Sequence, residues 1–213
     1  MLAAFAGVAN AEPTGRVVGA VTITDADGKP VDAEAIIYVV GFRESPLPGA
    51  PTQIAQKNRA FVPDLVAITV GETVSFPNRD PFLHNVFSQA TARKFDLGSF
   101  KKDDEKSKDF PQPGVIDVYC NIHPEMAATI VVVPNRAHTR RKRDGTYVIA
   151  GVPPGSWTVF AYTRRVTTPA SAPVTVVAGQ DAKVDLALVR GGEPAHRNKY
   201  GERYHDTGTT TYR

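Results

Sequence analysis

The segment Tyr119-Cys120-Asn121-Ile122-His123-Pro124-Glu125-Met126 contains the only cysteine of the chain, followed by a histidine at +3 and a methionine at +6. A further histidine, His84, lies 36 residues before the cysteine. One thiolate, two imidazoles and a more distant thioether are the donors of a type 1 copper site, in which the thiolate and the imidazoles form a trigonal plane. The pattern therefore predicts one copper ion, with the ligands His84, Cys120, His123 and Met126.

Two other interpretations of these residues are weaker. A zinc site more often uses several cysteines or histidines, and methionine is a poor zinc ligand. A buried, inert cysteine beside a surface histidine and a core methionine is the ordinary alternative. With only five histidines and two methionines in 213 residues, chance produces this spacing with a probability on the order of 2 in 10,000. The remaining histidines, His138, His196 and His205, follow no ligand spacing, which argues against a second copper site.

The composition excludes several classes of protein. The single cysteine rules out an intrachain disulfide and any metal site with four cysteines or a CxxC pair. A net charge of +3 is too small to indicate nucleic acid as a partner, and there is no phosphate-binding glycine-rich loop. No Ser-His-Asp set, carboxylate pair or second metal cluster stands out, so we expect no enzyme.

The body of the chain is typical of strands and turns. The 17 glycines and 17 prolines make up about 16% of the residues, a little above the usual share, and mark many turns. The mixed-charge stretch 101–109 is expected to be a loop. Strands spaced 8–12 residues apart predict an all-β fold made of β-sandwiches. The expected strands are 16–24, 34–42, 60–70, 73–77, 83–87, 115–119, 127–133, 146–152, 157–163, 172–177 and 182–188.

Both ends of the chain differ from the body. Residues 1–11 form an apolar run ending Ala-Asn-Ala, which resembles a signal peptide cleaved before Glu12 and predicts a periplasmic or otherwise exported protein. The usual basic residues are missing, which suggests a start further upstream; an ordinary apolar N-terminal element is the alternative. No stretch reaches the roughly 20 apolar residues of a transmembrane helix. Residues 191–213 form a polar tail, expected to be mobile or to lie along the surface.

The central part of the chain, about 52–134, resembles the cupredoxins, the plastocyanin/azurin family. The C-x2-H-x2-M loop is similar to the short, amicyanin-type ligand loop, and an F-x-N-x-D stretch (76–80) precedes an HNV triplet (84–86) as in that family. The resemblance implies a Greek-key β-sandwich that carries single electrons. It also implies that Asn85 ties the two ligand segments together and points its backbone N–H at the thiolate. Redox partner proteins would dock on an apolar patch near His123, with Ile122 and Pro124 as candidate members.

The flanking segments 19–35 and 144–159 resemble the two halves of a carboxypeptidase-regulatory, transthyretin-like (Ig-like) β-sandwich. We expect such halves at 12–45 and 141–190, around a cupredoxin domain at 46–136. Whether the cupredoxin is inserted into this sandwich or packs beside it stays open. The flanking sandwich is interpreted as a structural support, with partner or glycan binding as the alternative. The whole pattern is similar to exported proteins of the methylamine-utilisation type.

These observations predict an exported electron carrier with one type 1 copper. A periplasmic copper storage or delivery protein is the first alternative, and a binding module with a vestigial copper site is the second. The basic run 136–143 suggests an acidic redox partner or an anionic membrane surface, unless it is a solvated connector. The sequence indicates no oligomeric state.

Overall fold

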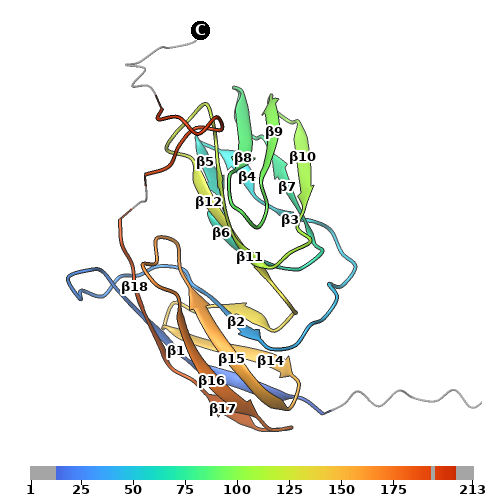
Figure 1. Ribbon diagram of the computed structural model, residues 1–213, viewed down its shortest axis with the longest axis vertical. Coiled ribbons are helices and arrows are strands. Elements are labelled where there is room, and N and C mark those ends of the chain that lie inside the picture. Colours follow the sequence, from blue (N-terminus) through green and yellow to red (C-terminus); the bar gives the residue numbers. More distant parts are fainter. Residues whose placement is uncertain (1–12, 193–194, 205–213) are drawn as a thin grey trace, which may run out of the picture.

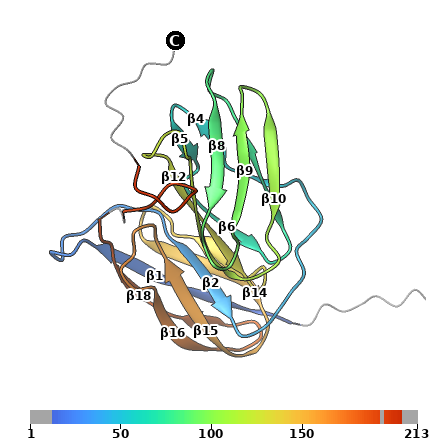
Figure 2. The same ribbon diagram turned by 45° about the horizontal axis from the view of Figure 1, so that its top comes forward.

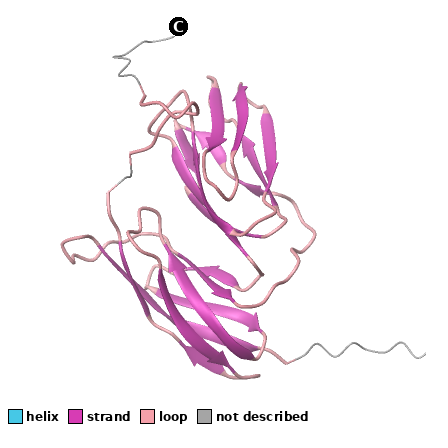
Figure 3. Cartoon of the chain, in the orientation of Figure 1, coloured by secondary structure: helices cyan, strands magenta, loops and turns pink. Residues whose placement is uncertain are grey.

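The computed structural model describes residues 13–192 and 195–204. Every regular element in these two ranges is a strand, so the all-β prediction is confirmed (Figure 3). Accordingly, no helix suited to crossing a membrane occurs within them. The predicted leader (1–11) and the last tail residues (205–213, including His205) lie outside the described residues.

One group of strands combines residues from both ends of the chain and lies in the lower half of Figure 1. Its two sheets enclose an apolar core dominated by valine, isoleucine and leucine, with the buried Tyr147 among them. The first sheet contains β14 (Thr146–Val152), β1 (Gly15–Thr24) and β17 (Asp181–Lys183), and β18 (Leu186–Val189) also pairs with β1. The second contains β13 (His138–Arg140), β2 (Ile36–Val40), β15 (Gly155–Tyr162) and β16 (Ala170–Val176).

The central part of the chain forms the second group, in the upper half of Figure 1. Its core is rich in phenylalanine and includes Cys120 and Met126. One sheet contains β10 (Glu105–Asp109), β7 (Thr73–Pro77) and β3 (Thr52–Gln53). The larger sheet contains β6 (Leu65–Thr69), β12 (Ala127–Val133), β11 (Gly114–Tyr119), β8 (His84–Ser88) and β9 (Phe95–Phe100). A short hairpin, β4 (Ala55–Lys57) and β5 (Ala60–Val62), accompanies them.

Strand β12 is buried on both faces, which explains its continuous apolar sequence. Side chains alternate between the two faces of a strand, so Ile130 and Val132 pack in the phenylalanine-rich core. Val131 and Val133 point the other way and pack with Ile36 and Tyr162, which belong to the lower group of strands. The two groups are therefore joined by an apolar contact as well as by the chain.

One expectation about the central region is wrong. Residues 105–109 of the mixed-charge stretch are not a loop but the edge strand β10, paired with β7. Charged side chains are common on edge strands, where they discourage pairing with another chain. The alternating exposure along β10 accommodates them, because Lys106 and Lys108 are half-buried while their neighbours are exposed.

Candidate metal centre

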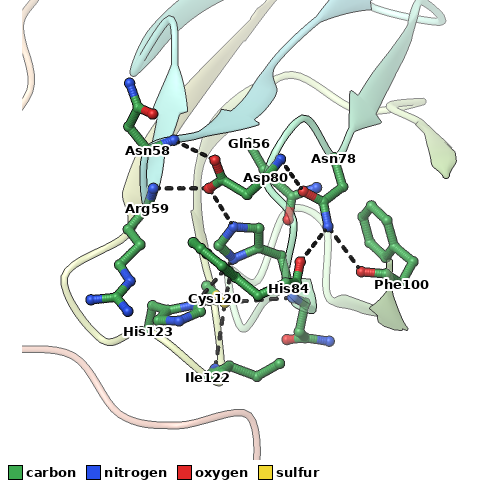
Figure 4. A network of polar contacts seen from close by, with 12 residues as sticks. Gln56, Asn58, Arg59, Asn78, Asp80, His84, Phe100, Cys120, Ile122 and His123 are labelled. Carbon is green, nitrogen blue, oxygen red and sulfur yellow. Dashed lines mark hydrogen bonds and ion pairs between the residues drawn. The ribbon is translucent and has the colours of Figure 1, made fainter. Parts of the chain in front are cut away.

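Three predicted ligands converge at one end of the larger sheet of the upper group. Strands β8 and β11 are antiparallel neighbours, with Tyr119 opposite Phe87. His84 at the start of β8 therefore lies beside the end of β11, where Cys120 follows directly. His123 is in the loop that leads from there to β12. Figure 4 shows the three side chains pointing toward one another.

The three donor atoms form a nearly isosceles triangle. Cys120 Sγ lies 3.9 Å from His84 Nδ1 and 3.9 Å from His123 Nδ1, and the two nitrogens are 3.1 Å apart. The centre of such a triangle lies about 2.1 Å from every corner, close to the roughly 2.0–2.3 Å at which a first-row ion such as zinc binds imidazole and thiolate. The donors therefore fit a single metal ion in their own plane, the arrangement of a trigonal site with two imidazoles and a thiolate.

Burial differs among these residues. His84 and Cys120 are completely buried, whereas His123 is partly exposed. Met126 is buried in the same core as Cys120 and closes the loop through its backbone. Its N–H donates to the His123 carbonyl at 3.0 Å, and the Cys120 N–H donates to the Met126 carbonyl at 3.2 Å. The loop is thus a compact turn, and the ligand role of Met126 stays a prediction.

The environment of the thiol favours a bound cation. Burial raises the pKa of the Cys120 thiol, while backbone N–H groups oppose this rise. Two of these groups, from Asn85 and Ile122, point at Sγ from 3.5 and 3.4 Å. They can stabilise a thiolate once a cation compensates for the lost solvation, because a coordinating thiol is deprotonated by its metal.

Asn85 connects the two segments that carry the donors. Its backbone N–H points at the Cys120 sulfur, and its side-chain oxygen accepts a hydrogen bond from the Asn121 N–H at 3.3 Å. Its amide nitrogen donates to Asp96 at 2.7 Å. Asn85 therefore fixes the position of β8 relative to the loop after β11.

Asp80 is a functional candidate that the sequence analysis did not identify. One of its carboxylate oxygens lies 2.8 Å from His84 Nε2, so the ring donates its Nε2–H there and leaves Nδ1 with a free lone pair. The backbone N–H groups of Asn58 and Arg59 donate to the same carboxylate at 2.7 and 2.9 Å (Figure 4). Burial alone would raise the pKa of Asp80, but the hydrogen bonds from Arg59, His84 and Asn58 outweigh it and lower the pKa.

Asn78 fixes the backbone of Asp80 and thereby the position of its carboxylate. Its side-chain oxygen accepts a hydrogen bond from the Asp80 N–H at 2.9 Å. Its amide nitrogen donates to the Phe100 carbonyl at 3.1 Å (Figure 4). It also donates to the Phe82 carbonyl at 2.9 Å. The sequence signal that could have identified Asp80 is the F-x-N-x-D stretch, because its carboxylate stands four residues before His84.

Apolar side chains surround the partly exposed edge of the site. Leu83 is 52% exposed and Ile122 is 43% exposed. The Phe82 ring lies 5.2 Å from the His84 ring and 5.5 Å from the His123 ring, with the Arg59 guanidinium 5.3 Å from its centre. The donor cluster therefore reaches the surface at an apolar edge.

No protein-family model matches the chain, and no curated protein matches it. Among solved structures, it is similar to a purple cupredoxin from Nitrosopumilus maritimus, at 26% identity over 38% of this chain and 99% of that one, with a TM-score of 0.35. It is also similar to a reduced amicyanin variant, at 24% identity over 46% of this chain and 98% of that one, with a TM-score of 0.38. A copper-containing nitrite reductase from Thermus scotoductus matches at 24% identity over 45% of this chain but 25% of its own, with a TM-score of 0.39.

Proposed function

We propose that this protein is an exported type 1 copper protein that carries single electrons. The observation that carries the proposal is the triangle formed by His84, Cys120 and His123, whose centre fits one metal ion. Soft sulfur suits Cu(I), and imidazole accepts Cu(II), so this donor set disfavours neither redox state. Met126 is proposed as the fourth and weaker ligand, and a bound copper ion would supply the one-electron chemistry.

The residues of the chain limit rearrangement during electron transfer. Asp80 holds the His84 ring in one tautomer and one orientation, and Asn85 ties that strand to the thiolate loop. Donors held by packing and hydrogen bonds keep their geometry when the charge at the centre changes. Such a site suits an electron carrier.

Exchange with a partner is expected at the apolar edge. Of the three donor residues only His123 is partly exposed, and Ile122 and Leu83, which directly precede His123 and His84 in the sequence, are exposed. The basic run 136–143 contributes little to docking because three of its arginines are paired within the chain. The pairs are Arg136–Glu44, Arg140–Glu34 and Arg141–Asp32. An acidic partner therefore draws less support from this run than the sequence suggested.

Copper storage or delivery is the second candidate and uses the same ligands. The complete burial of His84 and Cys120 favours the carrier, because a delivery site must hand its ion to an acceptor. Competition with a Cu(I) chelator separates the two: a carrier retains Cu(I), whereas a delivery protein loses it readily. The flanking strands are proposed as a structural support, with 12–45 and 141–190 forming one domain and 46–136 the other.

Addition of Cu(II) to the purified protein tests the proposal. We expect an intense blue thiolate-to-copper absorption at one equivalent, absent in Cys120→Ser and His84→Gln. The matched control is His138→Gln, which makes the same change on strand β13, away from the donor cluster. A colourless protein after Cu(II) addition contradicts the type 1 site. A vestigial site predicts this colourless result together with normal folding.

A further inference from the structure

Residues 195–204, here called the strap, run along the loop that carries Cys120. The chain leaves the lower group of strands after β18 and rises to the donor end of the upper group, as Figures 1 and 2 both show. We propose that the strap is part of the metal site and that Tyr204, His196 and Lys199 are positioning residues for the ligand loop. This inference rests on the proposed function.

Two hydrogen bonds join the strap to the first residues of the ligand loop. The Tyr204 hydroxyl donates to the backbone carbonyl of Cys120 at 3.2 Å. The backbone N–H of Lys199 donates to the side-chain oxygen of Asn121 at 2.9 Å, and the Lys199 carbonyl accepts from Gln89 at 2.6 Å. The strap thus contacts the loop at the cysteine itself and at the residue that follows it.

Aromatic packing holds Tyr119, the residue that precedes Cys120. The His196 ring stacks on Tyr119, the last residue of β11, with ring centres 4.0 Å apart and planes inclined by 9°. The Tyr204 ring meets His196 edge-on at 5.2 Å. Tyr119, Cys120 and Asn121 are therefore all fixed by one short segment from a distant part of the sequence.

A third contact links the strap to the other ligand-bearing strand, β8, through Asp96 of β9. The Lys199 ammonium lies 2.8 Å from one oxygen of Asp96, whose second oxygen accepts from Asn85 at 2.7 Å. Asn85 is the residue that directs its N–H at the thiolate. The strap consequently bridges the segment of His84 and the loop of Cys120, the two parts that must stay in register.

These contacts have a thermodynamic consequence. Fixing a loop costs conformational entropy, and a loop that is already ordered loses less when it binds its ligand. If the strap stabilises the ligand geometry, metal binding must stabilise strap docking by the same free energy. Loosening the strap should therefore mobilise the loop and speed metal loss, without removing any metal ligand.

The first test uses the full-length, metal-free protein. Amide hydrogen exchange is measured across 120–126 in Tyr204→Ala and His196→Ala, with His196→Phe as the conservative rescue that keeps a stacking ring. Arg203→Ala is the control within the strap, because Arg203 is exposed and makes none of the contacts described above. We expect faster loop exchange in the first two variants and nearly wild-type exchange in the other two.

The second test measures copper loss to a chelator. Tyr204→Phe removes one hydrogen bond and keeps the ring, so we expect loss roughly five-fold faster, with the blue absorption retained. Tyr204→Ala should lose copper faster still, and Arg203→Ala should match the wild type. The inference is overturned if Tyr204→Ala and His196→Ala match Arg203→Ala and the wild type in loop exchange. A wild-type protein that binds no copper refutes the proposed function alone, because the exchange experiment still decides whether the strap holds the loop.

Discussion

Asp80→Asn tests the idea that a buried carboxylate sets the tautomer of a ligand histidine. The substitution keeps the size of the side chain and replaces one oxygen with an NH2 group. In the structure, one oxygen accepts from Asn58, and the other accepts from both Arg59 and His84. Asparagine has a single acceptor oxygen, so one of these two positions must receive a donor.

Each orientation of the new amide has a defined cost. With the NH2 group toward Asn58, two N–H donors face each other in a buried site. With the NH2 group toward His84, it also faces the Arg59 N–H, another donor. The ring must then accept at Nε2, which moves its proton to Nδ1, the atom that faces Cys120. An unsatisfied buried donor costs about 1–3 kcal/mol. Loss of a partner that orients a ligand typically weakens metal affinity about 10–100-fold.

Two assays measure these effects, with Asp144→Asn as the control. Asp144 is an exposed turn residue whose carboxylate accepts from Thr146, so the control has the same change in net charge away from the site. Urea unfolding of the metal-free protein should show a loss of about 1–3 kcal/mol for Asp80→Asn. Copper competition should show the 10–100-fold loss of affinity. Wild-type unfolding and wild-type copper affinity in Asp80→Asn would refute the reasoning.

Two further predictions concern stability. Burial and the nearby His84 lower the pKa of His123. In the unfolded chain, His123 binds a proton near the ordinary histidine pKa of about 6.5, whereas in the folded chain it binds one only at lower pH. The free energy of unfolding of the metal-free protein should therefore decrease as the pH falls below about 6.5, and His123→Gln should make this decrease smaller in urea unfolding. The same pH dependence in the wild type and in His123→Gln would contradict this prediction. Gly19→Ala would place Cβ 1.8 Å from the Val184 carbonyl oxygen, a backbone atom, so we expect a loss of about 3 kcal/mol or more. The control is Gly49→Ala, whose Cβ would meet no atom within 4 Å, so its stability should stay within about 0.5 kcal/mol of the wild type. Equal melting temperatures for the two variants would contradict the prediction, because the backbone around Gly19 would then have moved to make room for the methyl group.

The loop from Cys120 to Met126 could be predicted from sequence because its proposed ligands lie close together and belong to residue types that are rare in this chain. Three of the four proposed ligands lie within seven residues, and a strand on either side fixes where they can be. The buried strand at 127–133 was also predictable, since a continuous apolar run leaves no polar face for solvent. The domain boundaries, the leader and the ligand role of Met126 stay predictions.

Other features depended on contacts that no local pattern encodes. The charged stretch at 105–109 reads as a loop, and only its pairing with β7 makes it an edge strand. Asp80 stands four residues before His84 in the sequence, but its role requires the hairpin of β4 and β5 to supply two N–H donors. A carboxylate in a turn otherwise has an ordinary local explanation.

By itself, the sequence determined the chemistry of this protein: the kinds of donor, their order along the chain and the β-strands that carry them. Side-chain identity and a period of two suffice for that, because both are local properties. Only the tertiary structure decided which other groups hold those donors, such as the Asp80 carboxylate on His84 and the strap on Cys120. The contact of Tyr204 with Cys120 spans 84 residues of chain, and the geometry of these contacts exists only after the core has packed.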